Sequence, residues 1–221
     1  MRLVILGPPG AGKGVEAERL SQRYGISHIS TGEILRSAVK EGTPWGERAK
    51  VFLDRGELVP DEVMMELVRD RLGQEDCQRG FILDGFPRNL AQAKGLEAIG
   101  REMGWSLNGV IDIEASGETI LLRLSNRRAC SSCGAIYNLI TAPPEVDGIC
   151  NRCGGRLYQR EDDRPQTIKK RLSIYLKEIS ELQDYYRSQG ILIGVKGNGD
   201  AKAVFKDIVG KLAPRTEVKY G

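Results

Sequence analysis

A glycine-rich run constrains this chain more than any other feature. The run reads Gly7-Pro8-Pro9-Gly10-Ala11-Gly12-Lys13-Gly14, and it lies between an apolar segment, 2–6, and a segment with helical periodicity, 13–24. It matches the pattern G-x-x-x-x-G-K, whose backbone N–H groups converge on an anion at the positive end of the helix. Because such a loop needs a buried strand before it and a helix after it, the sequence predicts an α/β protein with a parallel sheet.

Strand-like and helix-like segments alternate along the rest of the chain. Short apolar runs bounded by Gly, Asp or Asn predict five buried strands at 2–6, 27–29, 80–83, 110–113 and 191–195. Helical periodicity predicts helices over 13–24, 31–41, 45–55, 61–72, 90–102, 117–126, 165–188 and 201–212. The predicted fold class is therefore a five-stranded parallel sheet of the P-loop NTPase type with helices on both faces, and the polar residues 214–221 are expected to form a loose tail.

Charge and hydropathy exclude several classes of protein. Lys and Arg total 33 and Asp and Glu 30, and a net charge of +3 is too small and too mixed to predict binding to nucleic acid or to a membrane surface. The apolar stretches are shorter than the roughly 18 residues of a membrane helix, and no secretory signal follows Arg2. We therefore expect a cytoplasmic protein with no nucleic-acid or membrane partner.

The cysteines predict a structural Zn²⁺ site. Four of them form two C-x2-C pairs separated by 16 residues, and the members are Cys130, Cys133, Cys150 and Cys153. This spacing is typical of a four-thiolate zinc site, and thiols stay reduced in the cytosol. The segment 130–162 has few large apolar residues, so we expect it to be an insertion that needs its metal to fold. Cys77 is interpreted as a buried small hydrophobe.

A carboxylate ends one predicted strand. Phe81-Ile82-Leu83-Asp84 resembles a Walker B element, in which Asp84 points at Mg²⁺ beside the phosphates. Many buried strands end in Asp by chance, but a phosphate loop in the same chain favours this interpretation. The residue after Lys13 is Gly14 rather than Ser or Thr, so the usual hydroxyl ligand of Mg²⁺ is absent.

Several arginines form a second group of candidate residues. Arg88 follows Asp84 closely, and Arg123 and Arg127 lie four residues apart on one predicted helix, where they would share a face. Arg160 closes the cysteine insertion and Arg171 lies in the long helix after it. Each could be a solvated surface charge, but together they could converge on phosphate oxygens, which arginine forks match. The single histidine, His28, is expected to be a spectator.

These motifs together resemble the adenylate kinase family of ATP:AMP phosphotransferases. The resemblance rests on the run 7–14, on Ser30-Thr31-Gly32 with Leu35-Arg36, and on 83–88 with Gln92, and it covers nearly the whole chain. It implies transfer of the terminal phosphoryl group from Mg-ATP to AMP to give two ADP, by a monomer. It also implies a core (1–29, 60–126 and 164–221), an AMP-binding helical insertion (30–59) and a lid (127–163), which resembles the zinc-binding lid of bacterial-type members.

The resemblance also implies a role for particular residues. The residues implied in catalysis are Lys13, Asp84, Arg88, Arg123, Arg127, Arg160 and Arg171. The residues implied in ATP binding are Gly10, Ala11, Gly12, Lys13, Gly14, Val15, Arg127, Ile136, Tyr137 and Gly199. The residues implied in AMP binding are Thr31, Arg36, Glu57, Leu58, Val59, Gly85, Phe86, Pro87, Arg88, Gln92, Arg160 and Arg171. Within these sets, Gln92 is expected at the adenine edge of AMP, and Ile136, Tyr137 and Gly199 at the base of ATP.

The chain departs from the family pattern at three positions. Val15-Glu16 stands where the family usually has Thr-Gln, and Glu33 where an aspartate is common. Val15 lacks the hydroxyl group of that threonine, so we expect the affinity for ATP or Mg²⁺ to be the property that this substitution changes. Two alternatives stay open on the sequence: a small P-loop kinase acting on UMP, CMP or a metabolite, against which Gln92 is the main argument, and a zinc-ribbon module that binds nucleic acid.

Overall fold

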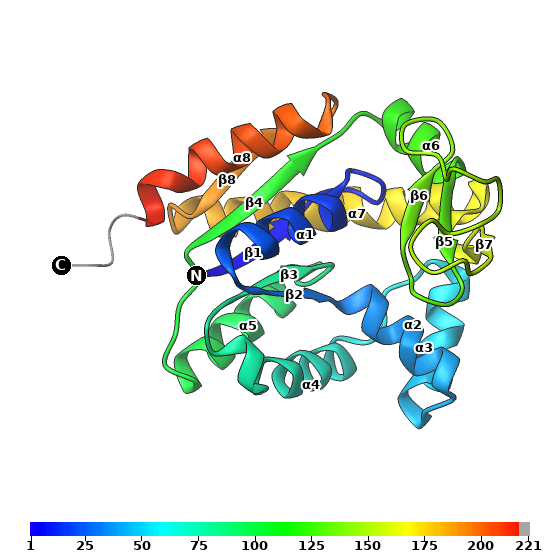
Figure 1. Cartoon of the computed structure of the whole chain (residues 1–221). Helices are drawn as coiled ribbons and strands as arrows, with labels where there is room; N and C mark the ends of the chain where they lie inside the picture. The colour runs from blue at the N-terminus through cyan, green and yellow to red at the C-terminus, as the bar shows by residue number, and fades with distance from the viewer. Residues whose placement is uncertain (217–221) are drawn as a thin grey trace.

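The computed structural model describes residues 1–216, and its centre is a parallel sheet of five strands in the order β2-β3-β1-β4-β8 (Figure 1). The strands are β1 (Arg2–Leu6), β2 (Ser27–Ser30), β3 (Phe81–Asp84), β4 (Gly109–Glu114) and β8 (Leu192–Lys196). In the central strand Leu3 pairs with Ile82 on one side and with Gly109 on the other. All carboxyl ends therefore meet at one edge of the sheet, where ligands of open α/β sheets bind.

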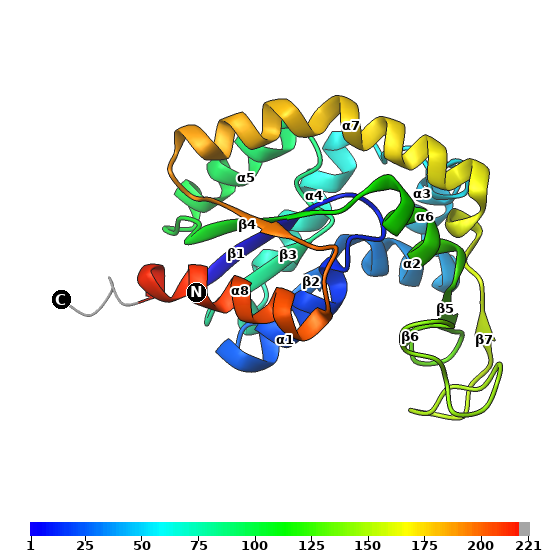
Figure 2. The same cartoon turned by 90° about the horizontal axis from the view of Figure 1, so that it is seen from above.

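Helices cover both faces of the sheet (Figure 2). One face carries α1 (Lys13–Tyr24) and α8 (Ala201–Thr216), and the other carries α4 (Asp61–Leu72), α5 (Leu90–Glu102) and α7 (Pro165–Ser188). Successive strand residues point to opposite faces, so Leu3 and Ile5 pack with α1 and α8, while Val4 and Leu6 pack with the other group. The two hydrophobic cores follow from this alternation.

The remaining helices lie near the carboxyl edge of the sheet. They are α2 (Thr31–Glu41), α3 (Pro44–Arg55) and α6 (Gly117–Ser125), and the short 3-10 segment Glu161–Asp163 precedes α7. A second 3-10 segment, Glu75–Cys77, lies at the opposite end of the sheet, before β3, where the Asp76 carbonyl accepts from the hydroxyl of Ser27 at the start of β2. The pair α2 and α3 packs closely together at one side (Figure 1). Thr43 caps α3 by accepting a hydrogen bond from the backbone N–H of Gly46.

The segment with the cysteines forms a small sheet of its own. Its antiparallel strands, in the order β6-β5-β7, are β5 (Arg127–Cys130), β6 (Ile136–Asn138) and β7 (Leu157–Tyr158). This sheet lies at the far end of the molecule from the N-terminus, beside α2 and α6 (Figures 1 and 2).

The predicted fold class is confirmed, and the expected strands and helices agree with the observed ones within one residue at most ends. The expected loose tail is wrong for 214–216, because α8 continues to Thr216, and residues 217–221 lie outside the described part of the chain. Val204, Ile208 and Leu212 bury one side of α8 on the sheet, and this packing supports its last turns. Among the described residues, no helix combines the length and the apolar composition that crossing a membrane requires.

Candidate active site

The phosphate loop leaves β1 and wraps tightly before α1. Gly7 and Gly10 have φ angles of 142° and 80°, and a Cβ at Gly7 would lie 2.5 Å from the carbonyl oxygen of Ile113. Only glycine combines an unstrained positive φ angle with the absence of a Cβ that such a close backbone contact requires. The Lys13 Nζ donates to the carbonyl oxygens of Gly7 and Pro8, at 2.8 and 2.9 Å. No side chain of the described residues caps the start of α1. The N–H groups of Val15 and Glu16 donate to the carbonyl oxygen of Gly12, so those of Lys13 and Gly14 are the first-turn donors that can bind an anion.

Asp84 lies next to this loop, as the sequence predicts. Its carboxylate Oδ2 is 3.4 Å from the position that a Cβ on Gly14 would occupy, so the acid stands beside the site where a hydroxyl would follow Lys13. His28 Nε2 lies 3.8 Å from the same oxygen, within reach of an ion pair but not of a hydrogen bond. Burial opposes the charge of Asp84, but His28 and Lys13 outweigh it and hold the pKa of this carboxyl below its ordinary value.

A pocket collects many of the residues expected to bind AMP. Six of them line it, namely Glu57, Leu58, Val59, Gly85, Arg88 and Gln92, together with Leu35, Leu53 and Met64. Thr31 is fully buried and donates its hydroxyl to the carbonyl oxygen of Asp84 at 3.3 Å, and Phe86 is fully buried before the cis bond to Pro87. Arg36 lies near Arg160 and Asp162. Apolar walls with a few polar groups are typical of a small-molecule site.

The Gln92 amide is fixed by a network that sequence reasoning missed. Its Oε1 accepts from the backbone N–H of Arg88 at 2.8 Å, and its Nε2 donates to Asp61 Oδ1 at 2.7 Å. Asn89 Nδ2 donates to both oxygens of Asp61 at 3.0 Å, and Asn89 Oδ1 caps α5 by accepting from the backbone N–H of Gln92. An Asn three residues before Gln92 indicates a helix cap, but no local pattern points to Asp61.

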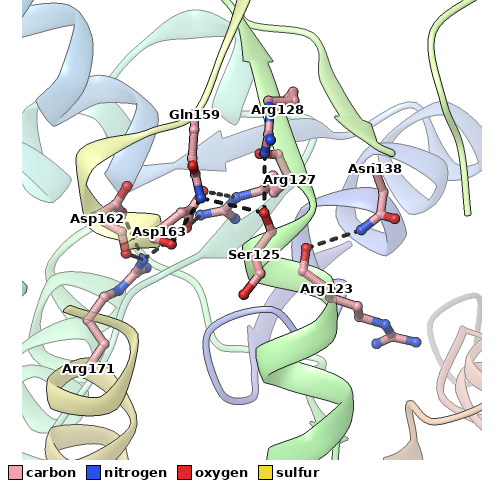
Figure 3. Close-up of polar contacts among 9 residues, drawn as sticks. All are labelled: Arg123, Ser125, Arg127, Arg128, Asn138, Gln159, Asp162, Asp163 and Arg171. Carbon is pink, nitrogen blue, oxygen red and sulfur yellow. Dashed lines mark hydrogen bonds and ion pairs between the residues drawn. The ribbon is translucent and has the colours of Figure 1, made fainter. Parts of the chain in front are cut away.

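Arginines of β5 and α7 pair with two neighbouring aspartates, Asp162 and Asp163 (Figure 3). Arg127 in β5 makes a two-pronged ion pair with the fully buried Asp163, through Nε at 2.7 Å and one NH group at 2.5 Å. Arg171 in α7 pairs with Asp162 at 2.8 Å. Burial would raise the pKa of Asp162, but Arg171 and Arg127 outweigh it and keep the pKa below its ordinary value.

Arg123 does not share a helix face with Arg127, contrary to the prediction. The helix α6 ends at Ser125, so Arg127 already belongs to a strand, and the two guanidinium groups point apart (Figure 3). Arg123 donates to the carbonyl oxygens of Ala11 and Gly197, at 3.1 and 2.9 Å. It therefore joins the phosphate loop to the turn 197–200, which contains Gly199.

The site carries more positive than negative charge. Its six cations are Lys13, Arg36, Arg88, Arg127, Arg160 and Arg171, and the carboxylates near them are Glu33, Asp84, Asp162 and Asp163. Burial, together with repulsion from Arg88, Arg171 and Arg127, lowers the pKa of Lys13 to about 8. The Nε of the buried Arg160 has no hydrogen-bond partner among the described residues. A polyanion would relieve both the repulsion and the unsatisfied donor.

The four cysteines of the small sheet form a metal-binding geometry. Their sulfur atoms all lie within 4.8 Å of one another, with 3.5 Å between Cys130 and Cys153 and 3.6 Å between Cys133 and Cys150. Tetrahedral sulfurs about 2.3 Å from a zinc ion lie about 3.8 Å apart, whereas a disulfide needs about 2.05 Å. The donor set therefore fits Zn²⁺ and not a pair of disulfides.

Two of the three residues expected at the ATP base, Ile136 and Tyr137, lie in this sheet, whereas Gly199 lies in the turn after β8. Tyr137 in β6 places its hydroxyl 3.4 Å from the Cys150 sulfur and accepts from the backbone N–H of Asn151 at 2.9 Å. Ile136 precedes it and is exposed. Neighbouring strand residues point to opposite faces, so the side chains of Ile136 and Tyr137 leave β6 in different directions.

Comparison with known proteins agrees with this geometry. A model of the adenylate kinase family matches residues 5–191. The chain belongs to the adenylate kinase family. Adenylate kinase from Archaeoglobus fulgidus is 50% identical to this chain over 208 residues, which is 94% of this chain and 96% of the relative. The Bacillus subtilis enzyme gives the same identity and coverage, and that of Thermodesulfovibrio yellowstonii is also 50% identical, over 97% of its length.

The match to the family confirms the resemblance that the sequence motifs indicated. The matched region contains the phosphate loop from Ile5 onward, the pocket and the cysteine segment. The adenylate kinase fold thus accounts for a parallel sheet whose carboxyl edge carries a phosphate loop with Lys13 and, on the next strand, Asp84. The individual ligand contacts of these residues stay predictions.

Proposed function

We propose that this chain catalyses the reversible transfer of the terminal phosphoryl group of Mg-ATP to AMP, which yields two ADP. The observation that carries the proposal is the excess of buried and partly buried cations where the phosphate loop, the pocket and the arginines of β5 and α7 meet. Two phosphorylated substrates can approach each other only where their mutual repulsion is neutralised. Membership in the adenylate kinase family supports this reaction.

The reaction needs no protein nucleophile. An oxygen of the AMP phosphate attacks the γ-phosphorus of ATP in line with the bond to the β–γ bridging oxygen, which breaks and leaves with ADP. We assign the β- and γ-phosphates to Lys13 and the N–H groups of 10–15, and the AMP phosphate to Arg36 and Arg88. The arginines Arg127, Arg160 and Arg171 would stabilise the charge of the phosphoryl group in transfer.

Asp84 is the residue that would hold Mg²⁺. Mg²⁺ keeps several waters and binds through one or two carboxylates and substrate phosphates, and Asp84 beside Gly14 and Lys13 offers one such carboxylate. When bound, the ion neutralises phosphate charge. We assign a structural role to Zn²⁺ in the four-cysteine site, because four thiolate ligands leave no open coordination position for a substrate. A monomeric state and a cytoplasmic location stay predictions.

A coupled assay of ADP formation tests the proposal. With ATP and Mg²⁺, AMP should be a far better acceptor than UMP or CMP, because the pocket with Gln92 offers a purine edge both a donor and an acceptor. Omitting Mg²⁺ should abolish turnover. Equal rates with UMP would contradict the assignment of AMP as the acceptor.

A further inference from the structure

The amide of Gln92 is held by two groups of opposite hydrogen-bonding character. The Arg88 backbone N–H can only donate, and it reaches Oε1; the Asp61 carboxylate can only accept, and it takes a hydrogen from Nε2. The side chain of Gln92 is 2% exposed and lines the pocket, whereas Asp61 approaches the amide from the first turn of α4.

These two contacts fix which end of the amide is oxygen. If the amide were reversed, its oxygen would face the carboxylate of Asp61 and its NH₂ would face the N–H of Arg88, so both hydrogen bonds would be replaced by repulsion. The carboxylate cannot turn away, since Asn89 Nδ2 bonds both of its oxygens. Asn89 is itself held as the cap of α5.

The fixed amide presents one donor and one acceptor in a set order to the pocket. After the contacts to Arg88 and Asp61, Oε1 keeps a second lone pair and Nε2 a second hydrogen, which are available to a base in the pocket that Gln92 lines. A 6-amino purine offers the matching pair, a donor at its amino group and an acceptor at N1. A 6-oxo purine offers the reverse pair, an acceptor at O6 and a donor at N1.

We propose that Asp61 determines the base specificity of this pocket: it holds the Gln92 amide in the orientation that accepts a 6-amino purine monophosphate and rejects a 6-oxo one. The inference rests on the proposed contact between Gln92 and the AMP base. Asp61 is a positioning residue, because it acts through Gln92. The same hydrogen bonds also hold α4 against α5, so the test must separate specificity from stability.

The test compares AMP with inosine monophosphate as acceptors, using ATP, Mg²⁺ and the full chain. Asp61→Asn keeps the size of the side chain but lets it either donate or accept, so that only the Arg88 backbone N–H still opposes the reversed amide. We expect the ratio of kcat/KM for AMP to that for inosine monophosphate to fall at least tenfold, with the KM for ATP unchanged. Glu62→Gln is the matched control: it removes a charge from the same turn of α4, is exposed, and should leave the ratio unchanged.

A second variant weakens the same network from another side. Asn89→Ser keeps a good cap for α5 but removes the NH₂ group that holds Asp61, so the ratio should fall in the same direction by a smaller factor. If both Asp61→Asn and Asn89→Ser leave the ratio within twofold of the wild type, the inference is overturned. Melting curves identify a variant that fails to fold, in which case the other variant decides.

A double variant separates this inference from the proposed function. If Gln92→Ala lowers the ratio and Asp61→Asn lowers it no further in that background, Asp61 acts through Gln92 as proposed. A further fall of the same size in the double variant would overturn the inference. If Gln92→Ala alone leaves the ratio unchanged, the assigned contact between Gln92 and the base is wrong; if Gln92→Ala lowers the ratio and Asp61→Asn does not, only the role of Asp61 is wrong.

Discussion

Replacing Glu16 by glutamine should stabilise the folded chain at alkaline pH and do nothing at acid pH. Glu16 lies in the first turn of α1, is 3% exposed, and its Oε2 has no partner among the described residues. Its other oxygen receives a long contact of 3.4 Å from Arg19, which also donates to the carbonyl of Ala201. Burial raises the pKa of this carboxyl from 4.5 to about 7, against the weaker opposing charge of Arg19.

The sign of the effect follows from proton binding. Between pH 4.5 and 7 the folded chain holds a proton on Glu16 that the unfolded chain has released, so the free energy of unfolding decreases as the pH rises through this window. Above about pH 7 the carboxyl is ionised in both states, and the free energy of unfolding no longer falls on account of Glu16. A shift of 2.5 units corresponds to at most about 3 kcal/mol. Glutamine avoids this cost, so we expect Glu16→Gln to gain about 1 to 3 kcal/mol at pH 8.

Thermal unfolding at a series of pH values measures the effect. For a chain of this length, about 1 kcal/mol shifts Tm by about 2 to 4 °C, so Glu16→Gln should melt several degrees above the wild type at pH 8 and within one degree at pH 4. The control is Glu118→Gln, the same change at an exposed first-turn position of α6. A gain that does not depend on pH, or an equal gain at Glu118, would show that burial of the Glu16 charge is not the cause.

Three other perturbations test single residues of the candidate active site. Arg88→Ala should lower kcat by about 10³ to 10⁵ and change Tm little, since the Gly85 carbonyl is the one hydrogen-bond acceptor of its guanidinium among the described residues; a loss below tenfold would assign it to the surface. Arg127→Ala should lower kcat and also Tm, because it leaves Asp163 buried without its partner, and an unchanged Tm would refute that pairing. Val15→Thr should lower the KM for Mg-ATP but not for AMP, and an unchanged value would show that the backbone N–H suffices.

Removing the metal tests the role of the four-cysteine site. Cys130→Ser combined with Cys153→Ser should lower the melting temperature of the small sheet first, because this segment has few buried apolar side chains and a structural zinc can supply about 10 to 16 kcal/mol. Activity should persist below that temperature. Complete inactivation at low temperature, with the sheet still folded, would mean that the metal takes part in the reaction.

The parallel sheet, the phosphate loop and the cysteine site could all be predicted from local patterns of amino acids. These features are local: a loop such as 7–14 works through its own backbone and the helix after it, and the spacing of two C-x2-C pairs suffices to indicate four thiolates. The apolar runs predicted all five strands, because strands buried on both faces contain mainly apolar residues.

Contacts between side chains that are far apart in the sequence could not be predicted, because they depend on how distant elements pack. Asp61 and Gln92 are 31 positions apart, Arg127 and Asp163 are 36 apart, and Arg123 and Ala11 are 112 apart. No periodicity encodes such pairs, since their geometry depends on how α4 packs on α5 and how the small sheet meets α7. Burial of Glu16 is likewise a property of the packed helices, because a charge is costly only where the surrounding protein has displaced water.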